Sequence, residues 1–325
     1  MRYAVTGIAG FIGSHIAQTL LALGHEVHGI DNFHTGRPQN LEGIKGRIRF
    51  WEASILDYSV LTEAFEGCSY VFHEAAITSV PWSMEHPEET MRVNAEGTRN
   101  VLIAALRAGV ERSVIASSCA VYGDLAPPLR ESVELPDPLS PYARSKRVAE
   151  AIAKQYDAVA LRYFNVYGPR QDPDSPYSAV IPLFIRALIK GDEPTIYGDG
   201  TQTRDFVYVG DVVDANLLAA NVPNIEKQVF NVGTGRPVSI ANLLQTIDEV
   251  VGKKKVKWET DDPRAGDIQF SYADRRKGEK ELYLDDPTDL LEGLTSTVEW
   301  FGKQPETKPT KKAKPRTPAW RPPKV

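Results

Sequence analysis

The chain opens with residues 1–13, MRYAVTGIAGFIG, in which a short apolar run leads directly into three closely spaced glycines. The apolar residues that follow repeat with the spacing of one helix face. A strand, a glycine turn and a helix in this order are typical of a site for the pyrophosphate of a dinucleotide, because glycines allow close backbone approach and the helix N-terminus holds phosphate. We therefore predict an α/β fold with a dinucleotide site at Gly7, Gly10 and Gly13.

Short apolar runs alternate with longer helical patterns from residue 1 to about 165. The predicted strands are 2–6, 26–30, 48–52, 70–73, 113–117 and 159–162. The predicted helices between them are 11–23, 58–66, 88–108 and 141–156. Repeated β-α-β units with apolar strands favour a parallel sheet that is covered on both faces. The predicted fold class is α/β, a doubly wound parallel sheet of the Rossmann type.

The pattern changes after Gly168-Pro169, where loops rich in Pro, Asp and Tyr precede a predicted helix near 179–190 and further short elements. This change predicts a smaller mixed α/β domain over the carboxyl edge of the sheet, where ligands of open α/β sheets bind. The predicted division is 1–168 and 204–235 for the dinucleotide domain, and 169–203 and 236–302 for the smaller domain. At the end of the second dinucleotide-domain segment, residues 231–235 (NVGTG) are interpreted as a turn that returns the chain between the domains.

Composition and charge exclude several classes of protein. The net charge is −5, but residues 303–325 carry eight Lys/Arg and one Glu, so the rest of the chain is acidic, at about −12. We therefore expect no nucleic acid as its substrate, and we predict that the Pro-rich basic tail 303–325 is disordered. Two cysteines, Cys68 and Cys119, form neither a disulfide framework nor a metal-ligand pattern. The cysteines therefore predict no metal site. No apolar run has the length of a membrane span, so we expect a cytoplasmic protein without a membrane partner.

Asp31 lies at the end of the second predicted strand, 18 residues beyond Gly13. A carboxylate in this region can accept hydrogen bonds from an adenosine ribose, and it would repel the 2′-phosphate of NADP. The alternative is that Asp31-Asn32 only starts a turn. Its combination with the glycine turn favours ribose binding, with NAD as the cofactor.

Tyr142 and Lys146 stand four residues apart, which places them on one face of a helix. A tyrosine acts as a base near pH 7 only if a positive charge lies nearby, and Lys146 and a nicotinamide ring can both supply one. The alternative is an exposed helix that carries the pair by chance. The serine pair Ser117-Ser118, which ends a strand about two dozen residues upstream, favours chemistry. Cys119 is predicted to be structural.

The motifs taken together resemble those of the extended short-chain dehydrogenases/reductases, and within them the nucleotide-sugar 4-epimerases that act on UDP-glucose or UDP-N-acetylglucosamine. The resemblance runs from Met1 to about Phe301. It rests on the glycine turn and on HEAA at 73–76, SSCAVYG at 117–123, SPYARSK at 140–146, RYFNVYGPR at 162–170, GDGTQTRD at 198–205 and RAGD at 264–267. Ser54 stands where many relatives have an Asp that contacts the adenine amine. Glu74 replaces a commoner apolar residue, and no mechanistic role is assigned to it.

The resemblance implies tightly bound NAD, a UDP-hexose substrate and a homodimer joined through the helices near 88–108 and 141–156. The cofactor-binding residues that it implies are Gly7, Gly10, Phe11, Ile12, Gly13, Asp31, Asn32, Gly36, Ser54, Ile55, Ala75, Asn94, Ser117, Tyr142, Lys146 and Phe164. The implied substrate-binding residues are Thr78, Ser118, Tyr142, Asn165, Val180, Tyr197, Arg204, Arg264 and Ser271.

The expected chemistry uses Ser118, Tyr142 and Lys146. Tyr142 takes the proton of a sugar hydroxyl while the hydrogen of the same carbon leaves as hydride, which gives a ketone. Ser118 holds or relays the hydroxyl. In an epimerase the keto-sugar turns over and takes the hydride back on its other face, so NAD is regenerated.

The smaller domain supplies the groups that a UDP moiety requires. Arg204 and Arg264 match diphosphate-binding arginines, whose planar forks suit phosphate oxygens, although each is alternatively a surface ion-pair residue. Tyr197 matches an aromatic residue that stacks on uracil, against ordinary strand packing as the alternative. Ser271 occupies the position at which a Tyr in relatives limits the room for an N-acetyl group, so both plain and N-acetylated sugars are expected. A one-residue register change that brings Tyr272 into that position is the alternative.

Other functions remain as alternatives. A dehydratase or decarboxylase of this family would carry acidic residues where Cys119 and Ala120 stand, so elimination is disfavoured. A uronate epimerase would need an arginine for the sugar carboxylate, and Arg170 keeps that option open. A non-catalytic dinucleotide sensor would not need Tyr142, Lys146 and Ser118 together.

Overall fold

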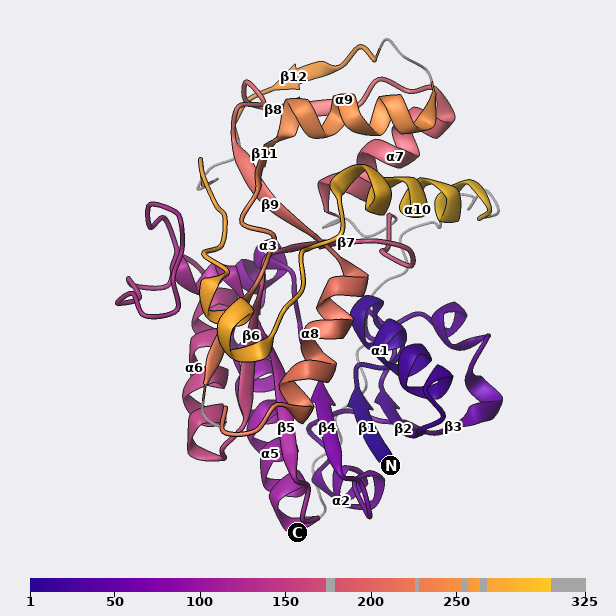
Figure 1. The fold of residues 1–325 in the computed structure, drawn as a ribbon, viewed down its shortest axis with the longest axis vertical. Helices are drawn as coiled ribbons and strands as arrows, with labels where there is room; N and C mark the ends of the chain where they lie inside the picture. Colours follow the sequence, from indigo (N-terminus) through magenta and orange to yellow (C-terminus); the bar gives the residue numbers. More distant parts are fainter. Residues whose placement is uncertain (174–178, 226–227, 253–255, 264–267, 305–325) are drawn as a thin grey trace.

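The computed structural model describes residues 1–173, 179–225, 228–252, 256–263 and 268–304. Its larger part is a sheet of seven parallel strands in the order β10-β6-β5-β4-β1-β2-β3. The strands are β1 (Arg2–Thr6), β2 (Glu26–Asp31), β3 (Ile48–Glu52), β4 (Tyr70–His73), β5 (Arg112–Ser118), β6 (Val159–Tyr163) and β10 (Val229–Val232). All six predicted strands are present, and the doubly wound α/β fold is confirmed (Figure 1).

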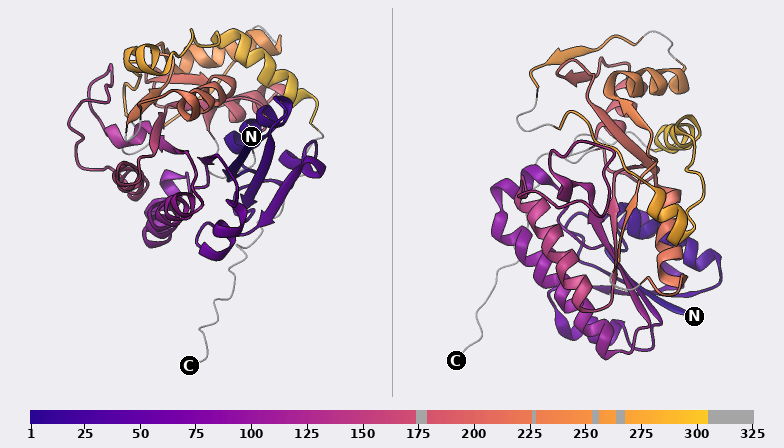
Figure 2. Two further views of the ribbon diagram at one scale, coloured as in Figure 1. Left: turned by 60° about the horizontal axis from the view of Figure 1, so that its bottom comes forward. Right: turned by 60° about the vertical axis from the view of Figure 1, so that its left-hand side comes forward.

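Helices cover both faces of this sheet (Figure 2). One face packs against α1 (Phe11–Ala22) and α8 (Val209–Asn221), through a core that includes Val5, Phe72 and Leu161. The other face packs against α2 (Tyr58–Ala64), α5 (Gly97–Arg107) and α6 (Pro141–Gln155). The apolar strands are buried on both sides, as a parallel sheet requires.

The predicted helix 88–108 is interrupted. The segment consists of α4 (Pro87–Met91), a π-helical turn (Arg92–Glu96) and then α5, and it is preceded by the short helix α3 (Val80–Glu85). Asn94, in the π-helical turn, accepts a hydrogen bond from the Ile77 N–H at 2.8 Å and donates to Ser145 of α6 at 2.9 Å. The interruption therefore comes with tertiary hydrogen bonds that a local sequence pattern does not reveal.

A smaller part lies over the carboxyl edge of the large sheet (Figure 1). It contains a three-stranded sheet of β11 (Pro237–Ser239), β9 (Thr203–Tyr208) and β7 (Asn165–Tyr167), and a pair of β12 (Glu259–Asp261) with β8 (Thr195–Tyr197). Its core is formed with α7 (Val180–Lys190), α9 (Ile240–Val251) and α10 (Leu290–Gly302). Short helical turns complete the described elements: η1 (Pro38–Leu41), η2 (Lys45–Arg47), η4 (Cys119–Tyr122) and η5 (Gly278–Leu282).

The interpretation of residues 231–235 as a turn alone is wrong for the first two residues. Asn231 and Val232 end β10, which pairs with β6 as the edge strand of the large sheet. The turn itself comprises the three residues from Gly233 to Gly235. The chain therefore returns to the large sheet between β9 and β11 of the smaller one.

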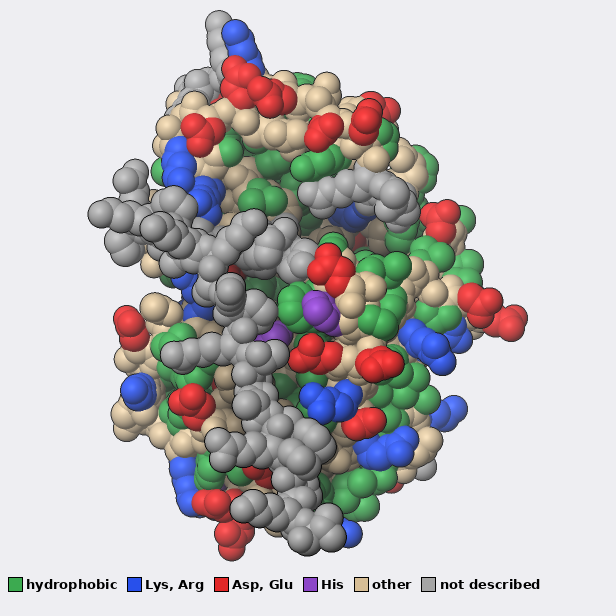
Figure 3. All heavy atoms as spheres, turned by 180° about the vertical axis from the view of Figure 1, so that it is seen from behind, with side chains coloured by type: hydrophobic (Ala, Val, Ile, Leu, Met, Phe, Trp, Pro, Cys, Tyr) green, Lys and Arg blue, Asp and Glu red, His purple; other side chains and the backbone are tan. Residues whose placement is uncertain are grey.

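The described surface mixes charges of both signs on the face shown in Figure 3. No helix of the described residues is long and apolar enough to cross a membrane. The predicted tail lies outside the described residues from position 305 on, while Lys303 and Gln304 follow α10 as a turn and a bend.

Candidate active site

The glycine turn joins β1 to α1 and lies against the end of β4. Gly7 has a φ of +70°, and a Cβ at this position would lie 2.7 Å from the Ala75 nitrogen. A Cβ on Gly13 would lie 2.3 Å from the Gly7 carbonyl oxygen. Gly10 precedes α1 without a side-chain cap. Only glycines fit here, and the turn leaves the backbone N–H groups at the start of α1 for an anion, which suits a dinucleotide pyrophosphate. Phe11 and Ile12, the first residues of α1, are half-buried beside it.

Asp31, at the end of β2, braces this turn. Its carboxylate accepts hydrogen bonds from the Ala9 N–H at 2.9 Å and from the Phe33 N–H at 2.8 Å. Burial raises the pKa of Asp31, and the two N–H groups oppose that rise. A Cβ on Gly36 would lie 2.5 Å from the Asp31 carboxylate, and exposed Asn32 accepts from the His34 N–H. Asp31 and Asn32 therefore do start a turn, as the alternative to ribose binding supposed. Contact between Asp31 and a ribose stays a prediction.

The residues predicted for the adenine side follow β3 and β4. Ile55 is buried, and a Cβ on Gly97 would lie 2.5 Å from its side chain. The Ser54 hydroxyl accepts from the Leu56 N–H at 3.2 Å, and the Ala75 N–H donates to Thr6 Oγ1 at 3.3 Å. These residues lie along the same edge of the sheet as the glycine turn.

Ser118, Tyr142 and Lys146 come together where β5 ends and α6 begins. Ser140 caps α6 by accepting from the Ala143 N–H at 3.1 Å, which sets Tyr142 in the first helical turn. A hydrogen bond joins the side chains of Tyr142 and Ser118. The Lys146 Nζ donates to the Ala116 carbonyl at 2.8 Å and lies 5.9 Å from the centre of the Tyr142 ring. The three predicted catalytic side chains therefore form one cluster.

Burial controls the charges of this cluster. It raises the pKa of Tyr142 to about 12, with the Ser118 hydrogen bond acting against the rise, and it lowers the pKa of Lys146 to about 8. Burial therefore dominates the pKa of Tyr142, and Lys146 is not among the groups that lower it. Ionisation of Tyr142 requires a further positive charge near its hydroxyl, which the oxidised nicotinamide ring carries.

Ser117 and Asn94, both predicted to bind the cofactor, use their side chains inside the protein. The Ser117 hydroxyl donates to Glu150 Oε1 at 2.5 Å, and Glu150 also pairs with Arg162 at 2.7 Å. Asn94 bonds Ile77 and Ser145, as described above, and is buried. The two residues position β5, α6 and the loop before α3, and direct contact with a cofactor stays a prediction.

Asp205, the last residue of the GDGTQTRD stretch, was not predicted as a site residue, but it connects β9 to two other segments. Its carboxylate is fully buried and accepts from the Thr234 N–H at 2.7 Å, the Gly235 N–H at 2.9 Å and the Ala273 N–H at 3.0 Å. It thereby ties β9 to the turn after β10 and to the segment that contains Ser271. Its place beside Arg204 was the available sequence signal.

The residues predicted to bind the substrate are spread over elements of both parts of the molecule. Phe164 is buried, and Asn165 follows it with a buried Oδ1 that has no partner within the described residues. Arg204 Nη1 donates to the Thr203 carbonyl at 2.8 Å. Tyr197 is half-buried at the end of β8, Val180 begins α7, and Thr78 is exposed. Arg264 lies outside the described residues.

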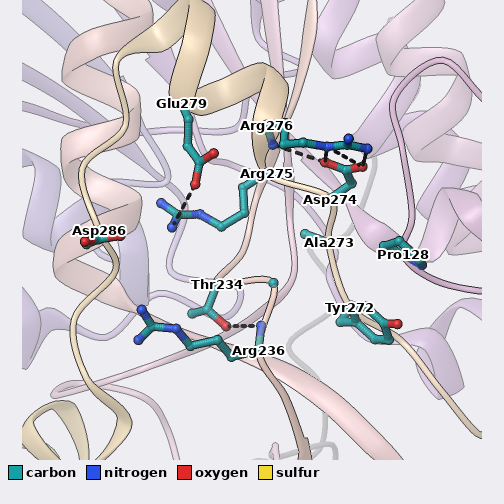
Figure 4. Close-up of a pocket in the computed structure, with 11 residues that line it drawn as sticks. Pro128, Thr234, Arg236, Tyr272, Ala273, Asp274, Arg275, Arg276, Glu279 and Asp286 are labelled. Atoms are coloured by element: carbon teal, nitrogen blue, oxygen red, sulfur yellow. Dashed lines mark hydrogen bonds and ion pairs between the residues drawn. The ribbon is translucent and has the colours of Figure 1, made fainter.

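The register around Ser271 is set by β9 and by the loop segment at Leu129. Phe270 pairs with Thr203, the Ser271 N–H donates to the Thr203 carbonyl at 3.2 Å, and Ala273 pairs with Leu129. Ser271 is buried, whereas Tyr272 lines an open pocket together with Pro128, Arg236 and Arg275 (Figure 4). None of the residues that line this pocket is a predicted site residue. Which of the two residues faces a sugar stays a prediction.

The surroundings of Arg170 and Cys119 bear on their possible roles. Arg170 Nη2 donates to Gln18 Oε1 of α1, while its buried Nη1 has no partner within the described residues. The use of Arg170 for a sugar carboxylate therefore stays open as an alternative. Burial raises the pKa of the Cys119 thiol to about 12, so a thiolate nucleophile is disfavoured. Among the described residues, no group of three or more His, Cys, Asp or Glu side chains is arranged to hold a metal ion.

Comparison with known proteins supports this picture. The model of the NAD dependent epimerase/dehydratase family matches residues 3–233. A putative UDP-glucose 4-epimerase of Methanocaldococcus jannaschii is 39% identical over 306 residues, which covers 91% of this chain and 97% of that protein. A UDP-N-acetyl-alpha-D-glucosaminuronate decarboxylase of Bacillus cytotoxicus is 36% identical over 315 residues, with 92% and 97% covered.

Among solved structures, a UDP-glucose 4-epimerase of Thermotoga maritima with UDP-glucose superimposes with a TM-score of 0.87 at 37% identity. The match covers 93% of this chain and 99% of that one. Similarity at this level extends to proteins with different reactions, so it does not by itself select one substrate.

Proposed function

The chain belongs to the NAD dependent epimerase/dehydratase family, and from this premise we propose that it interconverts UDP-hexoses at C4. The observation that carries the proposal is the cluster of buried Tyr142 and Lys146 with half-buried Ser118, at the same sheet edge as the glycine turn. An epimerase needs only this cluster and a cofactor that stays bound.

The residues present fit NAD. The Gly7–Gly13 turn is packed so closely against its own backbone and that of Ala75 that only glycines fit, and Asp31 lies at the end of the next strand. When bound, NAD supplies the acceptor and then the donor of the C4 hydrogen. Tyr142 takes the proton of the C4 hydroxyl and later returns it, and Ser118 holds that hydroxyl through its own. Lys146 keeps a positive charge beside Tyr142.

For the UDP moiety, we assign Arg204 and Arg264 to the diphosphate, Tyr197 to the uracil and Asn165 to the diphosphate or sugar. The unpartnered Asn165 Oδ1 supports a contact with the sugar, because a sugar hydroxyl can donate to this buried acceptor, whereas the diphosphate has no hydrogen to donate. Thr78 and Val180 are assigned to the rim of the same site.

We propose that the sugar pocket accepts UDP-glucose and UDP-galactose and also their N-acetylated forms. The small side chain of buried Ser271 supports this proposal, because a serine lacks the ring that would limit a C2 substituent, and Tyr272 lines the open pocket of Figure 4. Cys119 and Ala120, which stand where a decarboxylase or dehydratase would need acids, count against those reactions.

The proposal is tested by incubating the purified protein with a panel of UDP-hexoses, UDP-N-acetylhexosamines and UDP-glucuronate, with products identified by NMR. We expect C4 inversion of the neutral sugars without loss of water or carbon dioxide. Release of carbon dioxide from the uronate, or formation of a stable 4-keto-6-deoxy product, would overturn the assignment. The proposed homodimer through α4–α5 and α6 is tested separately by light scattering.

A further inference from the structure

An acidic residue lies at the carboxyl edge of the large sheet, between the glycine turn and the Tyr142 cluster. Glu74 directly follows β4, and its N–H donates to the Thr6 carbonyl at 3.2 Å. A Cβ on Gly7 would lie 3.0 Å from the Glu74 carbonyl carbon. The strand order places β4 between β1, which carries the turn, and β5, which carries Ser118. A dinucleotide that reaches from the turn to Ser118 therefore crosses the end of β4.

The Glu74 carboxylate is held in place by a chain of hydrogen bonds from two other elements. The Tyr163 hydroxyl of β6 donates to Glu74 Oε1 at 2.8 Å. Asn216 of α8 donates to that hydroxyl at 2.8 Å and to the Val212 carbonyl at 2.8 Å. Because Tyr163 uses its single proton on Glu74, the contact favours the carboxylate as an acceptor.

The charged groups near Glu74 come from different sides. Burial raises the pKa of Glu74 to about 7, while the Tyr163 hydrogen bond and the Lys146 ammonium of α6 act against that rise. His73, its neighbour on β4, instead bonds Thr6 and Thr98, and burial lowers its pKa to about 3, so it stays neutral. Asn216 of α8 carries no charge. Lys146 is thus the cation that acts on Glu74, and the carboxyl group changes its charge near neutral pH.

We propose that Glu74 is a positioning residue that biases the bound nicotinamide toward its oxidised form. The oxidised ring carries a positive charge and the reduced ring does not, so a fixed carboxylate at this edge stabilises the oxidised form by Coulomb attraction. The cofactor begins and ends each proposed cycle in the oxidised form, and this bias opposes its accumulation in the reduced form between cycles. The inference depends on NAD binding, and it does not depend on which sugar is the substrate.

The test compares the wild type with Glu74→Gln, each with bound NAD and without sugar, and measures the midpoint potential of the bound cofactor. The glutamine keeps an oxygen for Tyr163 and removes the charge. We expect the ratio of reduced to oxidised cofactor at a fixed ambient potential to rise about tenfold in Glu74→Gln at about pH 8.5, which corresponds to about 30 mV. Tyr163→Phe is the matched control, because it removes the donor but keeps the carboxylate, and a smaller shift is expected.

The pH dependence of the midpoint potential shows whether the effect of Glu74→Gln comes from the lost charge or from a change in side-chain shape. In the wild type, protonation of Glu74 near about pH 5.5 should bring the potential close to that of Glu74→Gln, so the difference between the two proteins should vanish there. Equal potentials at about pH 8.5, or a difference that is the same at both pH values, would overturn the proposal. If Glu74→Gln does not retain NAD, the wild type alone tests the proposal. The midpoint potential of its bound cofactor should fall more steeply through about pH 7 than that of free NAD, and an equal slope would overturn the proposal.

Discussion

Acid should destabilise this protein through His73, whose ring is locked in the neutral state by a directional chain of hydrogen bonds. Thr98 Oγ1 donates to the Asn94 carbonyl at 2.6 Å, so it must accept from His73 Nε2 at 2.9 Å. His73 Nδ1 then accepts from Thr6 Oγ1 at 2.7 Å, and that oxygen in turn accepts from the Ala75 N–H. Protonation of Nδ1 would remove its role as an acceptor, and Thr6 Oγ1 would have to turn its own proton away in order to accept from the ring. Burial is the main cause that lowers the His73 pKa to about 3, and the positive charge of Lys146 adds to it.

The magnitude follows from proton linkage. The unfolded state binds a proton to His73 near pH 6.5, whereas the folded state resists it down to about pH 3. The stabilisation is therefore complete above about pH 6.5 and is lost as pH falls toward 3. At about pH 4 the loss amounts to about 3 kcal/mol, since one pKa unit corresponds to about 1.4 kcal/mol.

Glu74 changes the stability in the opposite direction as pH falls, so its effect on the free energy of unfolding must be distinguished from that of His73. The pKa of Glu74 is raised to about 7, so the folded state takes up a proton first and gains stability as pH falls through 7. The assay is urea unfolding of the wild type and His73→Gln between about pH 7.5 and 4 at constant ionic strength. The glutamine can still donate to Thr98 but does not titrate in this range, and Glu74 is common to both proteins. We expect the free-energy difference between the two to shrink by about 3 kcal/mol on acidification. Parallel profiles would refute the reasoning.

Four further outcomes are expected. Tyr142→Phe should fold and bind NAD but turn over about 10² to 10⁴ times more slowly, the usual scale for a positioned acid/base, and near-normal steady-state rates would remove Tyr142 from the mechanism. Dinucleotide released by denaturation should be NAD, because at about 4 Å and an effective dielectric constant near 20 the Asp31 carboxylate would repel a 2′-phosphate by on the order of 4 kcal/mol before screening; mostly NADP would contradict this. Ser271→Tyr should selectively suppress turnover of N-acetylated sugars, by about 1 to 3 kcal/mol in kcat/KM relative to the plain sugars, and equal losses on both would count against the pocket assignment. Glu150→Gln should lower the free energy of unfolding by about 3 to 5 kcal/mol, because it leaves the buried Arg162 guanidinium without its carboxylate, and calorimetry showing an unchanged Tm would contradict this.

The local pattern of the sequence was enough for the framework of the fold. The alternation of short apolar strands with helical stretches predicted six strands of the large sheet, because each buried parallel strand must itself be apolar. The glycines at 7, 10 and 13 predicted the turn, because no side chain fits where a Cβ of Gly13 would meet the Gly7 carbonyl. The four-residue spacing of Tyr142 and Lys146 predicted a shared helix face. In each case the cause lies within a few residues of the chain.

Only the tertiary structure decided the edge strand β10, the helix break at Asn94 and the surroundings of Glu74 and Ser271, because the residues that contact each other there are distant in sequence. Strand β10 was missed since its short edge run becomes a strand only by pairing with β6. The break at Asn94 depends on Ser145, 51 residues away, and the Glu74 carboxylate acquires its environment from Tyr163, 89 residues away. Likewise, Ser271 faces inward because Thr203 sets its register. Hydrogen bonds and charges that meet across elements are fixed by the packing of those elements, and no local period in the chain encodes them.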